Sequence, residues 1–371
     1  MTKKSLCLLF FLTIFLICCA DKDPITPETT LEDEINQLAA ENLKVGMVIG
    51  IIKKNQEKLI FTYGSKSREA NEKPDENTVF DIGSMTKTFT ATLLTEIYLN
   101  GTFTDDTVDH YLPQNVEMPK YNDTVIRIVH LLTHTSGLPR TPHEAGQTYP
   151  IPPKFNDENP YQNYTTDMVY DYLTNYCQLN FEPGTYWEYS NTGFGLLGHL
   201  VGLVNNSTYE DVLQTKIFGQ LGMSRSSLFL TEEQMTNYSL GYNTDLQNVP
   251  YYLANDIFQG AGFIKSTLND LFKYLDAQIG LTQTNLKNPM DMTHEPQVHI
   301  GTMGEQALAW FVLTLDDGQT IIYSGGDTQG HSSYIGFNKS LSTGAIVLSN
   351  YAMHGPQLTM GHKILEIINK Y

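Results

Sequence analysis

The combination of residue types best suited to chemistry is a serine and a lysine three positions apart, Ser84 and Lys87. This pair lies at the start of an expected helix. Apolar side chains recur four apart in residues 86–99, a spacing that predicts a helix ending before Gly101. Residues three apart share a helix face, so the lysine amine is expected beside the serine hydroxyl. A serine needs a base to become nucleophilic, and a helix N-terminus favours developing negative charge. The pair predicts a nucleophile with its base; the alternative is a helix cap and a surface lysine.

A second candidate pair is Tyr189 and Asn191, which lie between a turn and the expected helix 193–204. A tyrosine can act as a general base only where positive charge lowers the pKa of its hydroxyl, and Lys87 could supply that charge. The Asn191 amide could orient a carbonyl or amide of a substrate. The alternative is an aromatic packing residue followed by a turn.

A third candidate is the glycine-rich segment Ser324-Gly325-Gly326-Asp327, which follows an expected strand at 320–323. Glycines at a strand edge allow backbone N–H groups to approach a ligand closely. Such N–H groups are the donors that an oxyanion hole requires. Taken alone, however, the segment is more typical of a tight turn.

In this order and spacing, the three segments resemble the SxxK, YxN and [KHW]xG motifs of the serine β-lactamase-related family. That family includes class C β-lactamases, D-alanyl-D-alanine carboxypeptidases, D-aminopeptidases and related esterases. The resemblance covers residues 33–371, and three further segments support it: HLLTHTSGL at 130–138, FEPG at 181–184, and GAGF at 260–263 with Asp270.

The resemblance implies a mechanism through a covalent acyl-enzyme. Ser84 would attack a carbonyl, and Lys87 and Tyr189 would remove the proton and return it to the leaving group. The backbone N–H groups of Ser84 and Asp327 would hold the oxyanion, and Asn191 would hold the acyl side of the substrate. Water would then hydrolyse the acyl-enzyme, with no cofactor and no metal.

The sequence departs from the family pattern at Ser324, one of three expected substrate-binding residues with Gly325 and Gly326. Relatives carry Lys, His or Trp there, and the lysine binds the carboxylate of β-lactams or D-Ala-D-Ala peptides. A neutral serine therefore favours an esterase or a D-amino-acid peptidase, and the Asp327 carboxylate could also repel a carboxylate substrate. The alternative function is a catalytically weak surface lipoprotein that binds peptidoglycan or another partner.

The N-terminus predicts export. A basic start and an apolar stretch at 6–17, too short to span a membrane, are typical of a signal peptide at residues 1–18. Cys19 closes this stretch and is the expected lipidation site, followed by a tether at residues 19–32. We therefore expect a bacterial lipoprotein of the periplasm, outer membrane or cell surface, attached to the membrane through its lipid. Only Cys177 lies in the body of the chain, so no internal disulfide is expected.

The remaining pattern predicts an α+β fold, with helices near both ends and short strands that form one antiparallel sheet. A mostly helical lobe is expected at about residues 100–255. Expected strands lie at 45–53, 59–63, 320–323, 332–337 and 344–349, and expected helices at 32–43, 166–179 and 362–371.

The net charge of −18 argues against a nucleic-acid partner. A small-molecule or peptide substrate is expected instead, and compounds derived from the cell wall are candidates. His130 and His134 have a spacing seen in metal sites but lack a third ligand, so a structural role is expected.

Overall fold

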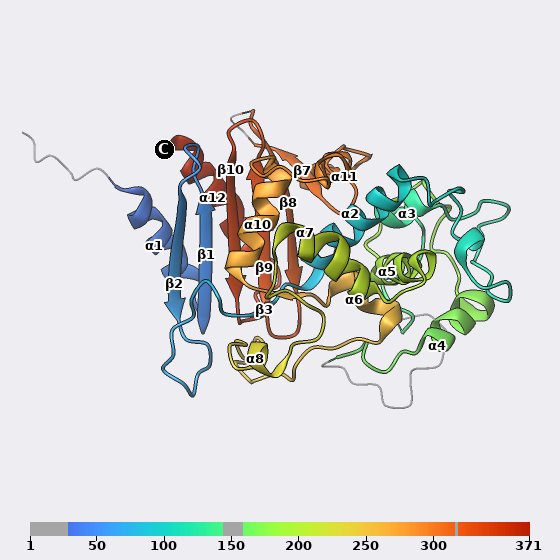
Figure 1. The fold of residues 1–371 in the computed structure, drawn as a ribbon, viewed down its shortest axis with the longest axis horizontal. Coiled ribbons are helices and arrows are strands. Elements are labelled where there is room, and N and C mark those ends of the chain that lie inside the picture. Colours follow the sequence, from blue (N-terminus) through green and yellow to red (C-terminus); the bar gives the residue numbers. More distant parts are fainter. Residues whose placement is uncertain (1–28, 144–158, 316–317) are drawn as a thin grey trace, which may run out of the picture.

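The computed structural model describes residues 29–143, 159–315 and 318–371. Its centre is an eight-stranded antiparallel sheet with the order β2-β1-β10-β9-β8-β7-β6-β5 (Figure 1). The pairing of β1 with β10 joins the two ends of the chain, so the expected antiparallel α+β architecture is confirmed. The strands are β1 (Gly46–Ile52), β2 (Lys58–Gly64), β5 (Val298–His299), β6 (Glu305–Gln306), β7 (Phe311–Thr314), β8 (Thr320–Asp327), β9 (Ser332–Asn338) and β10 (Thr343–Ser349).

The central strands are buried on both faces, because helices cover each side of the sheet. Helices α1 (Leu31–Asn42) and α12 (Pro356–Lys370) share one apolar core with Met47 and Ile49 of β1. Helix α10 (Leu268–Ile279) shares the other core with Val48. Successive side chains of a strand point to opposite faces, so the continuous apolar run of β1 supplies both cores.

Most of the other described residues form a helical lobe beside the sheet (Figure 1). The expected lobe at residues 100–255 is extended by α2 and α9, which pack against α5 from outside that range. A two-stranded sheet of β3 (Phe80–Asp81) and β4 (Lys265–Ser266) adjoins the lobe. The helices are α2 (Thr86–Leu99), α3 (Ile128–Leu132), α4 (Thr166–Asp171), α5 (Asn191–Asn205), α6 (Tyr209–Leu213), α7 (Gly219–Leu221), α8 (Glu232–Met235), α9 (Gln259–Gly262) and α11 (Lys287–Thr293).

Several boundaries differ from the sequence expectations. Helix α1 begins at Leu31, inside the expected tether, because Thr30 and Asp33 form a capping box. Strand β8 continues to Asp327, since its glycines pair with β9. Helix α12 begins at Pro356, six residues before the expected start, with proline in the first turn. The predicted signal peptide and Cys19 lie outside the described residues.

Within the described chain, no helix is both long enough and apolar enough to cross a membrane.

Candidate active site

Ser84 lies where β3 meets α2, in a short 3-10 turn at Gly83–Met85. Gly83 has φ +50°, and a Cβ there would lie 2.8 Å from the Asp327 backbone nitrogen, so glycine is required. The Ser84 hydroxyl does not cap α2, whose N-cap makes no side-chain hydrogen bond. Its oxygen instead lies 3.1 Å from Lys87 Nζ and 2.7 Å from the Tyr189 hydroxyl.

Lys87 lies on the first turn of α2, with its amine 3.1 Å from Ser84 Oγ. The Nζ atom is also 2.8 Å from Asn191 Oδ1 and 2.5 Å from the Ala261 carbonyl oxygen. The side chain is only 2% exposed. Burial, assisted by the nearby charge of Arg140, holds the pKa of Lys87 well below its usual value. This amine can therefore lose its proton far more readily than a surface lysine.

Tyr189 completes the contacts of the nucleophile, with its hydroxyl 2.7 Å from Ser84 Oγ. Lys87 Nζ lies 4.8 Å and Arg140 Cζ 5.0 Å from the centre of its ring. Burial nevertheless raises the pKa of Tyr189 to about 12, outweighing the lowering effects of the Ser84 hydrogen bond and Arg140. A role for Tyr189 as a base would need a lowered pKa, and the net effect here is a raised one, because desolvation is the largest contribution.

Asn191 is the first residue of α5, which starts at a capped N-terminus. The Ser190 hydroxyl accepts from Gly193 N–H at 3.0 Å, and the Arg140 carbonyl accepts from Asn191 N–H at 3.0 Å. The Asn191 amide nitrogen donates to the Tyr161 hydroxyl at 2.7 Å. Because its oxygen accepts from Lys87, this side chain links the nucleophile's base to the cavity wall.

His134 is a neighbour of the site that sequence reasoning left as structural. Its ring is 2% exposed and lies 4.3 Å from the Tyr189 ring, centre to centre. Nδ1 accepts the Ser190 backbone N–H at 3.1 Å, and burial holds the pKa of His134 well below 6.5. The neutral ring thus positions the segment that carries Tyr189. The HTSG sequence was visible, but its distance from Tyr189 was not.

The end of β8 lies directly against Ser84. A Cβ added to Gly326 would lie 2.1 Å from the Ile82 carbonyl oxygen and 2.5 Å from the Ser84 nitrogen. The Thr328 N–H donates to the His331 carbonyl at 2.8 Å. Hydrogen-bonded and non-hydrogen-bonded pairs alternate along an antiparallel ladder, so the next pair, Asp327 and Ser332, is not hydrogen-bonded. The Asp327 N–H therefore points away from β9, toward the start of α2 that carries the Ser84 N–H.

The Asp327 carboxylate is held toward α12. It accepts hydrogen bonds from the Ser332 hydroxyl at 2.5 Å, the His354 N–H at 3.1 Å and the Gln357 amide at 2.8 Å. These three donors offset its negative charge. The repulsion expected from this residue is therefore weaker than its type suggests.

Ser324 occupies the same face of β8 as Gly326, because side chains alternate along a strand. It is 3% exposed. The cavity at Ser84 has a volume of about 500 Å³, and the described residues that line it do not include Ser324, Gly325 or Gly326. Ser324 therefore leaves a neutral side chain on the face of β8 where Gly326 meets the Ser84 backbone.

The opposite side of the cavity is aromatic. The rings of Tyr252 and Phe263 are stacked with centres 4.9 Å apart, and Tyr161 meets Phe263 edge-on at 5.6 Å. Arg140 and Asn191 lie at the same cavity. Among the residues that the structure describes, no three potential ligands are grouped to hold a metal ion.

Comparisons of the sequence and of the structure with known proteins identify relatives of one family. The Beta-lactamase family model matches residues 31–365. A beta-lactamase of Psychrobacter immobilis is 25% identical over 81% of this chain and 70% of its own length. Penicillin-binding protein 4* of Bacillus subtilis is 28% identical over 74% of this chain and 61% of its own. A solved class C beta-lactamase superposes with a TM-score of 0.77 and 26% identity, covering 91% of this chain and 94% of that one.

Proposed function

Because the chain belongs to the beta-lactamase family, and is a serine hydrolase, we propose that it cleaves ester or amide carbonyls through an acyl-enzyme on Ser84. The observation that carries this proposal is the position of one hydroxyl between two proton-handling groups. Ser84 Oγ lies 3.1 Å from Lys87 Nζ and 2.7 Å from the Tyr189 hydroxyl.

Hydrogen-bond accounting supports Lys87 as the base. A neutral amine has two hydrogens, which can go to Asn191 Oδ1 and the Ala261 carbonyl, and a lone pair that can accept the Ser84 proton. Tyr189, whose pKa is raised to about 12, keeps its proton and donates it to Ser84 Oγ. Every polar hydrogen at the nucleophile then has an acceptor.

The acylation step follows from this arrangement. Lys87 takes the Ser84 proton while Oγ bonds to the substrate carbonyl carbon, and the carbonyl oxygen becomes an oxyanion. We assign the Ser84 and Asp327 N–H groups as its donors. As the bond to the leaving group breaks, Tyr189 gives its proton to that group and is reprotonated from Lys87. Water then attacks the acyl carbon by the same route, which releases the acid and restores Ser84.

The substrate class that we propose is an uncharged ester or a D-amino-acid peptide, such as one derived from the cell wall. The neutral and buried Ser324 supports this preference, because it supplies no cation on the β8 side of the cavity. The names of the relatives, beta-lactamase and penicillin-binding protein, point to β-lactams and cell-wall peptides as the compounds to test first.

A fluorophosphonate probe tests the proposal, because it reacts with serines that are activated beside an oxyanion site. We expect one covalent adduct, located at Ser84 by peptide mass mapping. Ser84→Ala should take no label, whereas Ser190→Ala, at a neighbouring hydroxyl that caps α5, should still be labelled at Ser84. Folded wild-type protein that takes no label, or takes it elsewhere, would contradict the proposal.

A further inference from the structure

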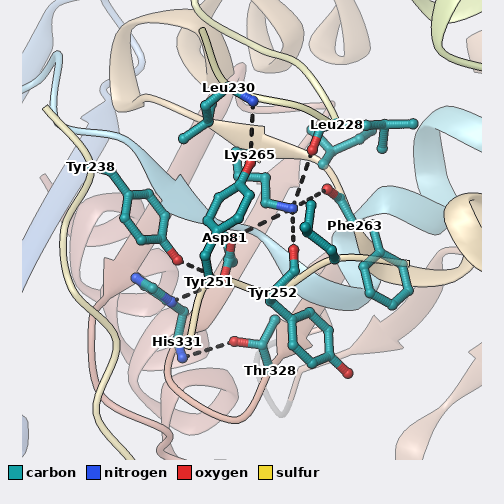
Figure 2. A network of polar contacts seen from close by, with 12 residues as sticks. Asp81, Leu228, Leu230, Tyr238, Tyr251, Tyr252, Phe263, Lys265, Thr328 and His331 are labelled. Atoms are coloured by element: carbon teal, nitrogen blue, oxygen red, sulfur yellow. Dashed lines mark hydrogen bonds and ion pairs between the residues drawn. The ribbon is translucent and has the colours of Figure 1, made fainter. Parts of the chain in front are cut away.

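A second group of buried charged side chains lies behind the cavity wall, and the proposed mechanism does not use it (Figure 2). It consists of Asp81 on β3, its cross-strand partner Lys265 on β4, and His331 between β8 and β9. Their exposed fractions are 3%, 0% and 1%. Buried charges are costly unless they are paired, so contacts that hold them together in the fold must compensate.

Lys265 connects this group to the aromatic wall of the cavity. Its amine donates to the carbonyl oxygens of Tyr252 at 2.5 Å and Phe263 at 3.1 Å, and lies 4.0 Å from Asp81 Oδ1 (Figure 2). Tyr252 and Phe263 are the stacked pair that lines the cavity. The charged group therefore contacts the site through its wall.

His331 connects two other segments. Its backbone N–H donates to the Thr328 hydroxyl at 3.0 Å, which closes the turn after Asp327. Its ring meets Phe80 edge-on, with centres 6.0 Å apart, and its Nδ1 lies 3.2 Å from Asp81 Oδ2. The Thr328 contact holds the segment that carries the Asp327 N–H. The Phe80 and Asp81 contacts hold β3, the strand that leads to the Ser84 N–H.

Both ring nitrogens of His331 face an acceptor. His331 Nε2 lies 3.0 Å from the Ser239 carbonyl oxygen, which can only accept a hydrogen, and Nδ1 faces the carboxylate. Burial alone would raise the pKa of Asp81, but the charges of His331 and Lys265 and the Tyr238 hydrogen bond hold it below its usual value. With a hydrogen on each ring nitrogen, both of these acceptors would be satisfied and the contact with Asp81 would be an ion pair.

We propose that His331 is a positioning residue, whose charged contact with Asp81 sets the distance between the Ser84 and Asp327 N–H groups. The inference rests on the proposed acyl transfer. Oxyanion donors must lie within a few tenths of an ångström of their place to be effective. The two segments already touch at Gly83 and Gly326, so a small shift of either one alters the pair of donors.

The test compares three single variants. His331→Gln removes the charge but can still donate to Ser239, and His331→Phe keeps only the ring. His294→Phe is the matched control, because His294 is also a buried histidine, 5% exposed, packed on Trp310 and outside the cavity lining. We measure the rate at which the fluorophosphonate phosphonylates Ser84, kcat and KM on a neutral aryl ester, and unfolding by urea.

We expect both His331 variants to lose about 10²-fold in phosphonylation rate and in kcat on the ester, with little change in KM. The His294 variant should keep wild-type rates even if it is destabilised as much. Unchanged rates in the His331 variants, or an equal loss in His294→Phe, would overturn the proposal. If the wild type itself takes no label, the proposed function fails first and the positioning role falls with it.

A measurement on the wild type covers the case in which the variants do not fold. With ¹⁵N-labelled histidine at neutral pH, we expect one ring with hydrogens on both nitrogens that exchange slowly with solvent. Burial keeps the pKa of His134 well below 6.5 and that of His294 at about 3, so neither buried ring gives this signal. Its absence would overturn the charged contact with Asp81 on which the proposal depends.

Discussion

At the scale of single residues, the site depends on burial more than on residue type. The same loss of water lowers the pKa of the Lys87 amine and raises that of the Tyr189 hydroxyl. Both shifts favour the uncharged form of the group. In the proposed mechanism, the two partners of Ser84 therefore have opposite tasks, the amine as proton acceptor and the phenol as proton donor.

Arg140 provides a test of this assignment. Its charge lowers the pKa of Lys87, so Arg140→Gln should raise that pKa and leave less neutral amine at a given pH. The acid limb of the kcat/KM profile on a neutral ester should therefore move to higher pH. The plateau above the limb should be kept, because Tyr189 with a pKa of about 12 retains its proton there.

The control is Arg68→Gln, an exposed arginine that donates to the Leu246 carbonyl. Its pH profile should match that of the wild type. An acid limb that stays in place in Arg140→Gln, or moves to lower pH, would show that neutral Lys87 is not the limiting species.

At the scale of elements, the end of β8 determines the geometry beside the nucleophile. Gly325 and Gly326 are adjacent but face opposite sides of the strand. A Cβ at Gly326 would meet backbone atoms of Ile82 and Ser84, whereas one at Gly325 would lie 2.4 Å from the end of the Leu358 side chain. Backbone cannot move aside as a side chain can, so the two positions differ in their tolerance.

We therefore expect Gly326→Ala to reduce kcat on an ester by about 10²-fold, because it displaces β8 from the Ser84 N–H. Gly325→Ala should retain most of the activity, since Leu358 can take another rotamer. Steady-state kinetics and circular dichroism on both variants check this. Equal losses in the two would mean that the β8 edge does not act through its contact with Ser84.

We expect β8 to influence substrate preference as well. A lysine in place of Ser324 would offer a charge-assisted hydrogen bond to a substrate carboxylate, worth about 1.5–3 kcal/mol, or roughly one to two decades in kcat/KM. We expect the wild type to favour a short-chain aryl ester over a cephalosporin. Ser324→Lys should narrow that gap by improving the cephalosporin more than the ester.

The test needs four values of kcat/KM, for the wild type and Ser324→Lys on the ester and the cephalosporin. Preference of the wild type for the cephalosporin, or an equal gain on both substrates, would rule out Ser324 as the selecting residue. The ester serves as the internal control for any general effect of the substitution on the buried face of β8.

At the scale of the whole molecule, residues from both ends of the chain build the sheet, and the lobe between them carries Tyr189 and Asn191. The N-terminal helix α1 packs on the C-terminal helix α12, and the Tyr371 hydroxyl donates to Glu34 at 2.9 Å. The cavity lies where the two halves meet, lined by the start of α2, the start of α5 and the end of β8.

We propose that the whole molecule is exported and held at a membrane by a lipid on Cys19, on the sequence pattern of residues 1–19. Expressed in a bacterium with its own N-terminus, the protein should enter the membrane fraction and incorporate labelled fatty acid. Cys19→Ala should abolish the incorporation, and Cys177→Ala is the control. Loss of label in Cys18→Ala but not in Cys19→Ala would reassign the site, and an unlabelled wild type would indicate plain secretion.

The sequence by itself determined the elements whose causes are local. Spacing along one helix placed Lys87 beside Ser84, and alternating and β-branched runs located β1, β2, β9 and β10, because these patterns depend on neighbours in the chain. The order of the three motifs also indicated the partners of the nucleophile. Short strands such as β5 and β6, with two residues each, carry too little pattern to be found this way.

Only the tertiary structure decided how the site is charged. Tyr189 and Asn191 reach Ser84 and Lys87 across 105 and 104 positions of sequence, and the roles of His134, Arg140 and His331 depend on equally distant segments. The pKa of Tyr189 is raised because the residue is buried. The Asp327 carboxylate is oriented by hydrogen-bond donors on other elements. Desolvation is a property of the packed molecule, so no local pattern in the sequence can report it.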